Sequence, residues 1–153
     1  QQRAAAAGPS RILATTVAVL LARGGHFAAL WAGDSRIYLL RGGELRRVTR
    51  DHSVVQEMVD DGTLSEAEAE AHPQANVITR AVGARGELVL DKVSDRILPG
   101  DLFLLCSDGL FKALPEALIA ERLRGGATAQ QLVAEAVAAG ARDNVTAVVV
   151  RVR

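Results

Sequence analysis

Three acidic residues stand where runs of apolar residues begin or end. Asp34 lies in GDSR between two apolar runs, Asp108 follows LFLLC in the segment CSDG, and Asp143 precedes VTAVVV in the segment DNVT. If the strands expected at 102–106 and 145–152 are antiparallel neighbours, the end of one lies beside the start of the other. Asp108 and Asp143 are then expected to meet at the same edge of a sheet.

A pair of carboxylates at such an edge predicts a cation site. Two neighbouring carboxylates disfavour each other's ionisation, and a divalent cation removes this cost. Ligands that are all oxygen atoms favour hard ions such as Mg²⁺ or Mn²⁺ over zinc. The alternative is that each acid is a turn residue, Asp34 in an Asx turn, Asp108 before Gly109 and Asp143 at the entry to a strand. Taken singly, the three short segments leave both interpretations open.

Two other residues could do chemistry. Cys106 is the only cysteine, so it forms no internal disulfide, and its place in an apolar run predicts a buried thiol rather than a nucleophile. His52, in the segment DHS, could act as a general acid because imidazole titrates near neutral pH. A role in a loop or at the hinge of a flap is the favoured interpretation of His52.

The positions of these residues depend on the elements around them. The first third predicts an antiparallel meander, because its apolar runs are joined by short Gly-rich turns. The middle predicts two short helices, the second opened by a Ser65–Glu68 capping box, in an acidic insert that is exposed and mobile. The expected strands are 15–22, 26–32, 36–40, 45–48, 87–98, 102–106 and 145–152, and the expected helices are 1–7, 53–61, 65–71, 115–123 and 128–139. This pattern is typical of a two-layer α/β (α+β) domain with mostly antiparallel strands.

Bulk composition excludes several classes of protein. The 153 residues suffice for one domain with its own core, and 49% hydrophobic with 24% charged residues is ordinary for a globular protein. Lys and Arg total 18, as do Asp and Glu, so we expect neither nucleic acid nor a membrane surface as a partner. No apolar run reaches the roughly 18 residues of a membrane span and no signal peptide is visible, so we expect a cytoplasmic location.

Five segments taken together resemble one protein family. WAGDSRIYLLRGGEL, TRDHS, NVITRAVG, GDLFLLCSDGL and ARDNVTAVVV are similar, in this order, to the C-terminal signatures of the bacterial 2C-type metal-dependent protein serine/threonine phosphatases. The resemblance covers nearly all of residues 11–153. It implies two packed, mostly antiparallel sheets flanked by helices, with the family's variable flap at about Ser53 to Asn76.

The resemblance also implies roles for individual residues. Asp108 and Asp143 match ligands of the family's binuclear metal centre, and Asp34 matches an acid that helps to hold a third, weaker metal ion. Arg36 is expected to pair with an acid. Residues that shape the site are expected to be Gly33, Ser35, Ser107, Gly109 and Asn144.

The family's N-terminal motifs are not found in this sequence. An Arg, a Glu ligand and the Asp that bridges both metal ions come from these motifs, and residues 1–10 contain no acid. We therefore expect 1–153 to be a single phosphatase 2C-like catalytic domain that is truncated at its N-terminus, with 53–76 as a flap-like insert. Metal binding and turnover by these 153 residues alone are expected to be impaired.

The function implied for the full-length protein is hydrolysis of phosphoserine and phosphothreonine in proteins by a metal-bound water. The expected cofactors are two, or with Asp34 three, Mn²⁺ or Mg²⁺ ions, and the flap is expected to influence the choice of substrate. The expected partners are a phosphorylated protein and a cognate Ser/Thr kinase. One alternative is a catalytically inactive, phosphatase-like regulatory or protein-binding module. Another is an unrelated α/β domain whose acids are turn residues.

Overall fold

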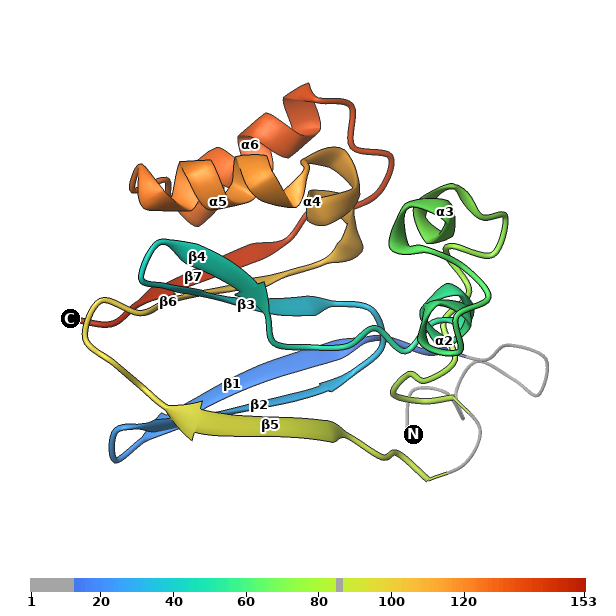
Figure 1. Ribbon diagram of the computed structural model, residues 1–153, viewed down its shortest axis with the longest axis horizontal. Helices are drawn as coiled ribbons and strands as arrows, with labels where there is room; N and C mark the ends of the chain where they lie inside the picture. The colour runs from blue at the N-terminus through green and yellow to red at the C-terminus, as the bar shows by residue number, and fades with distance from the viewer. Residues whose placement is uncertain (1–12, 85–86) are drawn as a thin grey trace.

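The computed structural model describes residues 13–84 and 87–153, which form two β-sheets with accompanying helices (Figure 1). The helix expected at 1–7 lies outside the described residues. The strands are β1 (Val17–Arg23), β2 (His26–Ala32), β3 (Arg36–Arg41), β4 (Glu44–Arg47), β5 (Asp91–Arg96), β6 (Leu102–Cys106) and β7 (Ala147–Arg151). The helices are α2 (Val54–Asp60), α3 (Glu66–Ala71), α4 (Asp108–Ala113), α5 (Glu116–Arg124) and α6 (Ala129–Ala138). None of these helices combines the length and apolar character that a bilayer crossing requires.

The strands form two antiparallel sheets, one with the order β1-β2-β5 and one with the order β4-β3-β6-β7. Two hairpins were correctly expected at Gly-Gly pairs, and the first turn has φ of 57° at Gly24 and 75° at Gly25. Glycine adopts these left-handed angles without the steric cost that a side chain imposes. β5 is shorter than the strand expected at 87–98, because only residues 91–96 of that segment pair with β2.

The two sheets pack face to face and enclose one of two apolar clusters. Phe27 of β2 meets Phe103 of β6 edge to face, with ring centroids 4.8 Å apart. Ile37 and Leu39 of β3 complete this inner layer. The fold class expected from the sequence, two packed and mostly antiparallel sheets with flanking helices, is confirmed.

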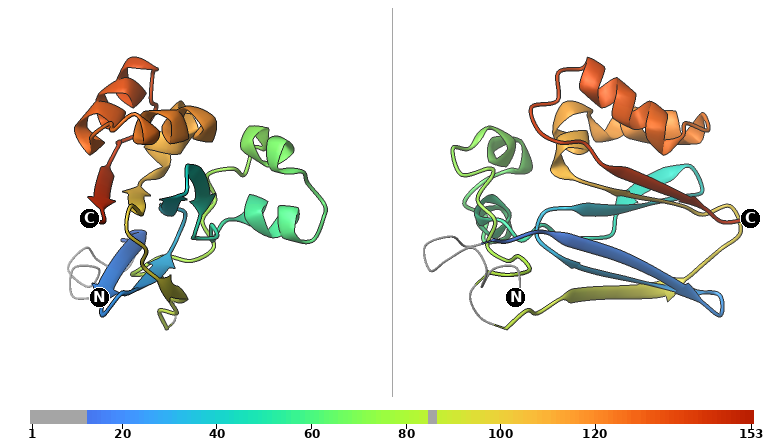
Figure 2. Two further views of the ribbon diagram at one scale, coloured as in Figure 1. Left: turned by 60° about the vertical axis from the view of Figure 1, so that its left-hand side comes forward. Right: turned by 180° about the vertical axis from the view of Figure 1, so that it is seen from behind.

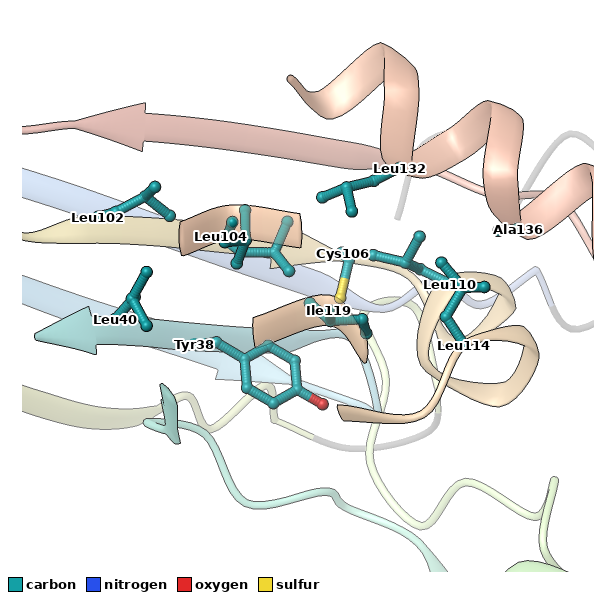
Figure 3. Packing of buried hydrophobic residues seen from close by; sticks show 11 residues of the cluster. Tyr38, Leu40, Leu102, Leu104, Cys106, Leu110, Leu114, Ile119, Leu132 and Ala136 are labelled. Carbon is teal, nitrogen blue, oxygen red and sulfur yellow. The ribbon is translucent and has the colours of Figure 1, made fainter. Parts of the chain in front are cut away.

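The second cluster lies between the β4-β3-β6-β7 sheet and three helices, α4, α5 and α6, which cover its outer face (Figures 1 and 3). Tyr38 and Leu104 point from the sheet toward Leu110, Ile119 and Leu132 of the helices, and all five are fully buried. α4 is a correction, because the sequence predicted no helix between the strand at 102–106 and the helix at 115–123. A helix forms there because Leu110 and Leu114, four residues apart, both reach this cluster.

The insert holding α2 and α3 stands beside the sheets, at the end opposite the C-terminus (Figures 1 and 2). The capping box of Ser65 and Glu68 is present as expected. Most of α3 is exposed, but α2 buries Val55 and Gln56, so the expectation of an exposed insert holds for only part of it. Its base is closed by a bridge between Ser53 and Ile78.

Candidate metal centre

The topology brings the three candidate acids to one end of the β4-β3-β6-β7 sheet. β6 is antiparallel to both of its neighbours, so Cys106 at its end lies opposite Arg36 at the start of β3 and Ala147 at the start of β7. Asp34 precedes Arg36, Asp108 follows Cys106, and Asp143 precedes Ala147, each by a few residues. The antiparallel pairing of β6 with β7, on which the sequence argument depended, is therefore present.

Ser107 joins the end of β6 to the loop that carries Asp143. Its backbone N–H donates to the Thr146 carbonyl at 3.0 Å, and its hydroxyl donates to the Asn144 carbonyl at 3.1 Å. The Thr146 N–H in turn donates to the Ser107 hydroxyl at 2.9 Å. These bonds hold the residue before Asp108 against the residues that follow Asp143.

Gly109, expected to help shape the site, lies within α4 and has no positive φ, so backbone conformation is not the reason for a glycine here. It is required for a different reason. A Cβ on Gly109 would lie 3.0 Å from the Asn144 carbonyl carbon, 3.3 Å from the Asp143 carbonyl oxygen and closer still to the Asn144 oxygen. The missing side chain therefore lets the first turn of α4 contact the backbone of the Asp143 loop.

Asp34 is buried, with 9% of its surface exposed, and it is electrostatically linked to Asp108. Burial raises the pKa of the Asp34 carboxyl, the negative charge of Asp108 raises it further, and the Lys112 ammonium opposes both effects. Gly33 has a φ of 111°, and a Cβ there would lie 2.7 Å from the Thr16 Cβ, so this position also requires glycine. The Ser35 hydroxyl is 2.8 Å from that of Thr16.

His52 holds the loop that carries Asp34. Its Nδ1 accepts a hydrogen bond from the Gly33 N–H at 3.1 Å, so its other nitrogen, Nε2, carries the proton and donates to Asp91 at 3.0 Å. Its ring stacks on Trp31 with centroids 6.1 Å apart. The hydrogen bond from His52 Nε2 lowers the pKa of Asp91, and the hydrogen bond and charge of Arg80 lower it further. Both nitrogens of His52 are engaged, which favours the loop role over the general-acid role.

Lys112 is a further residue of this region that sequence reasoning missed. Its ammonium donates to the Asp108 carboxylate at 2.7 Å and to the Asn76 side-chain oxygen at 2.6 Å. The spacing of four residues between Asp108 and Lys112 was the available signal, because it places both side chains on one face of a helix. That signal was lost when the helix itself was not predicted.

Arg36 and Cys106 behave as the sequence predicted. Arg36 makes a two-pronged ion pair with Asp51, closest at 2.7 Å, and its guanidinium lies 3.6 Å from the centroid of the Phe111 ring. Burial would lower the pKa of Arg36, but the hydrogen bonds and charges of Asp51 and Tyr38 together more than reverse this. Burial raises the pKa of the Cys106 thiol to about 12, so the thiol is inert.

The donor chemistry fits a hard divalent cation, but the ligand set is incomplete. Asp34 and Asp108 are carboxylates whose mutual repulsion a cation would relieve. Within residues 13–84 and 87–153, no group of three or more His, Cys, Asp or Glu side chains is arranged to hold a metal ion. A surface hollow of about 440 Å³, lined among others by Gly42, Glu116 and Arg124, lies near the far end of β3 and is not part of this site.

Curated relatives of this chain are bacterial phosphatases. The serine/threonine protein phosphatase PstP of Mycobacterium tuberculosis is 40% identical over 141 residues, which are 90% of this chain and 27% of the relative. The serine/threonine phosphatase stp of Listeria innocua is 38% identical over 77% of this chain and 48% of its own length. The chain thus spans about a quarter to a half of these proteins.

Solved structures give the same assignment. PppA, described as a key regulatory component of the type VI secretion system of Pseudomonas aeruginosa, is 42% identical with a TM-score of 0.84, over 97% of this chain and 61% of that one. The catalytic domain of PstP in complex with two manganese ions is 34% identical with a TM-score of 0.79, over 92% and 60%. The model of the family described as protein phosphatase 2C matches residues 1–148. This chain therefore belongs to the protein phosphatase 2C family.

Proposed function

We propose that the protein to which this chain belongs hydrolyses phosphoserine and phosphothreonine in other proteins, with Mn²⁺ or Mg²⁺ as its cofactor. The observation that supports this most is the β3-β6-β7 arrangement, which gathers Asp34, Asp108 and Asp143 at one end of a sheet. Relatives named as serine/threonine phosphatases support the substrate class, and the relative in complex with two manganese ions supports the cofactor. A protein kinase must supply such a substrate, because phosphoserine and phosphothreonine arise by phosphoryl transfer.

Asp108 and Asp143 would hold the principal metal ions, and Asp34 would contribute to a further one. Bound there, the ions would activate water and neutralise charge on the phosphoryl group. The chain's own residues keep the ligands in place. Ser107 and Gly109 hold the Asp143 loop against α4, and His52 holds the Gly33 backbone beside Asp34. The raised pKa of Asp34 means that an ionised Asp34 gains more from a nearby cation than an exposed carboxylate does.

We further propose that residues 1–153 form the C-terminal part of a single catalytic domain, with 53–76 as its flap. The match to only 60–61% of the two solved relatives supports this, as does the incomplete ligand set. The remaining ligands would then come from another part of the protein.

Hydrolysis of a phosphothreonine peptide by the full-length protein, with and without Mn²⁺, tests the proposal. Asp108→Asn should lower the rate by at least about 100-fold, because a ligand that also sets the local charge is lost. Asp95→Asn, an exposed acid on β5, serves as the matched control and should leave the rate unchanged. Turnover that survives a chelator, or full activity in Asp108→Asn, would contradict the proposal.

The incomplete ligand set also favours a second candidate function, a phosphatase-like binding module without turnover. The same experiment separates the two functions. A module would bind the phosphopeptide with measurable affinity, yet it would release no phosphate at any Mn²⁺ concentration.

A further inference from the structure

One ammonium group connects a candidate metal ligand with the flap, residues 53–76. Lys112 lies one helical turn after Asp108 on α4, so both side chains project from the same face. The Lys112 Nζ is 2.7 Å from Asp108 and 2.6 Å from the side-chain oxygen of Asn76. Asn76 is the last residue of the flap, so Lys112 contacts the flap where it returns to the sheets.

The chain returns from the flap to the sheets through residues 72–80, here called the return segment, whose backbone is hydrogen bonded to the start of the flap. The Val77 carbonyl accepts from the Val54 N–H at 3.0 Å, and the Thr79 N–H donates to the His52 carbonyl at 2.9 Å. These bonds join the two strands of chain at the base of the flap. A change in the contact between Lys112 and Asn76 therefore acts on the hydrogen-bonded base of the flap rather than on a free loop.

Lys112 also supplies positive charge where the acids are crowded. Its charge lowers the pKa of Asp34, opposing the effects of burial and of Asp108. A divalent cation is positively charged, as the Lys112 ammonium is, and at this site it would bind the same Asp108 carboxylate. Lys112 and the cation therefore compete for Asp108, since an ammonium and a metal ion cannot approach one carboxylate oxygen together without strong repulsion.

We propose that Lys112 is a positioning residue that couples cation binding at Asp108 to the base of the flap. Without a cation, Lys112 holds Asn76 next to Asp108. When a cation binds Asp108, it displaces the ammonium and releases Asn76, so the return segment 72–80 exchanges its amide protons faster. This inference rests on the proposed role of Asp108 as a metal ligand.

Hydrogen exchange of segment 72–80 and calorimetric titration with Mn²⁺, both on the full-length protein, test this coupling. In the parent protein, Mn²⁺ should speed exchange in 72–80. In Lys112→Met, exchange should be fast without Mn²⁺ and insensitive to it, and Mn²⁺ should bind about two- to fivefold tighter, the effect of removing a competing, partly exposed ion pair. Lys112→Arg keeps the charge and should keep the response to Mn²⁺.

Two further variants separate the parts of the coupling. Asn76→Ala removes only the flap contact, so exchange in 72–80 should be fast without Mn²⁺, and Mn²⁺ should bind slightly tighter, because its binding no longer breaks the Lys112–Asn76 hydrogen bond. Lys92→Met removes the one other lysine of residues 1–153, which is exposed on β5, and should match the parent in both measurements. Exchange in β6 and α6 reports whether each variant is folded.

The outcomes distinguish this inference from the proposed function. If the parent binds Mn²⁺ and Asp108→Asn abolishes binding, but Lys112→Met matches the parent in exchange and affinity, the coupling is wrong and the metal site stands. If the parent binds no Mn²⁺ and its turnover needs none, both are wrong.

Discussion

Gly109→Ala should weaken both the fold and the candidate metal site, although alanine is the better helix former. The added Cβ would lie 3.0 Å from the Asn144 carbonyl carbon and 3.3 Å from the Asp143 carbonyl oxygen, where ordinary contacts are 3.4–4 Å. Both neighbours are backbone atoms, so rotation of a side chain offers no relief. Either α4 or the Asp143 loop must therefore move.

The size of the effect follows from two opposing contributions. Overpacking a buried contact costs about 1–3 kcal/mol, and a clash with backbone belongs in the upper half of that range. Replacing a helical glycine by alanine returns about 1 kcal/mol, because the unfolded chain loses freedom. The net loss of unfolding free energy is thus about 1–2 kcal/mol. With a typical urea m-value of about 2 kcal/mol/M, the midpoint should fall by roughly 0.5–1 M.

Urea unfolding and Mn²⁺ titration, measured on the full-length protein, check this prediction. Gly125→Ala is a matched control, because its Cβ would meet its nearest neighbours at 3.5 Å and its φ of −72° suits alanine. Gly125→Ala should be neutral or slightly stabilising. If Gly109→Ala unfolds at the parent's urea midpoint and binds Mn²⁺ with the parent's affinity, the close-approach argument is refuted.

Three further predictions concern residues outside the acid cluster. The side chain of Asp101 is 1% exposed, and its hydrogen bonds to Arg41 hold its pKa below the ordinary value. Asp101 therefore contributes fully to the free energy of unfolding above the unfolded-state pKa of about 4, and this contribution is lost as the pH falls through the folded-state pKa. Asp101→Asn should cost about 2–3 kcal/mol at pH 7 by urea unfolding, and this cost should shrink as the pH is lowered and the Asp101 carboxylate of the folded parent becomes protonated. His52→Ala leaves the Gly33 N–H without its acceptor and should lower the free energy of unfolding by about 2–3 kcal/mol in the same assay. His52→Asn restores an acceptor near the position of Nδ1 and should recover part of this loss. Cys106 should react with a thiol reagent only in denaturant, since it is buried and its pKa is raised to about 12; rapid labelling of the native protein at pH 8 would contradict this.

Local signals explain why much of the fold was predictable. The Gly-Gly turns, the capping box at Ser65 and the apolar runs each depend on neighbouring residues, so a single sequence reveals them. The grouping of the acids was also accessible, because antiparallel pairing of β6 and β7 forces Asp108 and Asp143 to the same end. That inference needed one assumption about strand order.

The parts that were missed depend on contacts between distant residues. Gly109 disfavours a helix locally, yet burial of Leu110 and Leu114 against the sheet outweighs that preference and creates α4. Lys112 meets Asn76 across 36 residues, and His52 meets Gly33 across 19. No periodicity or composition encodes such pairs, so only the folded structure reveals them.

The central place of β6 also has a consequence for the order of folding. The β1–β2 and β3–β4 hairpins join strands that are adjacent in the chain, whereas β3 and β6 pair only after the flap and β5 have intervened. Pairings that close such long loops form slowly, because loop closure costs entropy before any contact compensates for it. Asp34 and Asp108 can meet only when this pairing is complete. A cation that needs both carboxylates would therefore bind the finished sheet and none of its separate hairpins, so adding it should slow unfolding rather than speed folding.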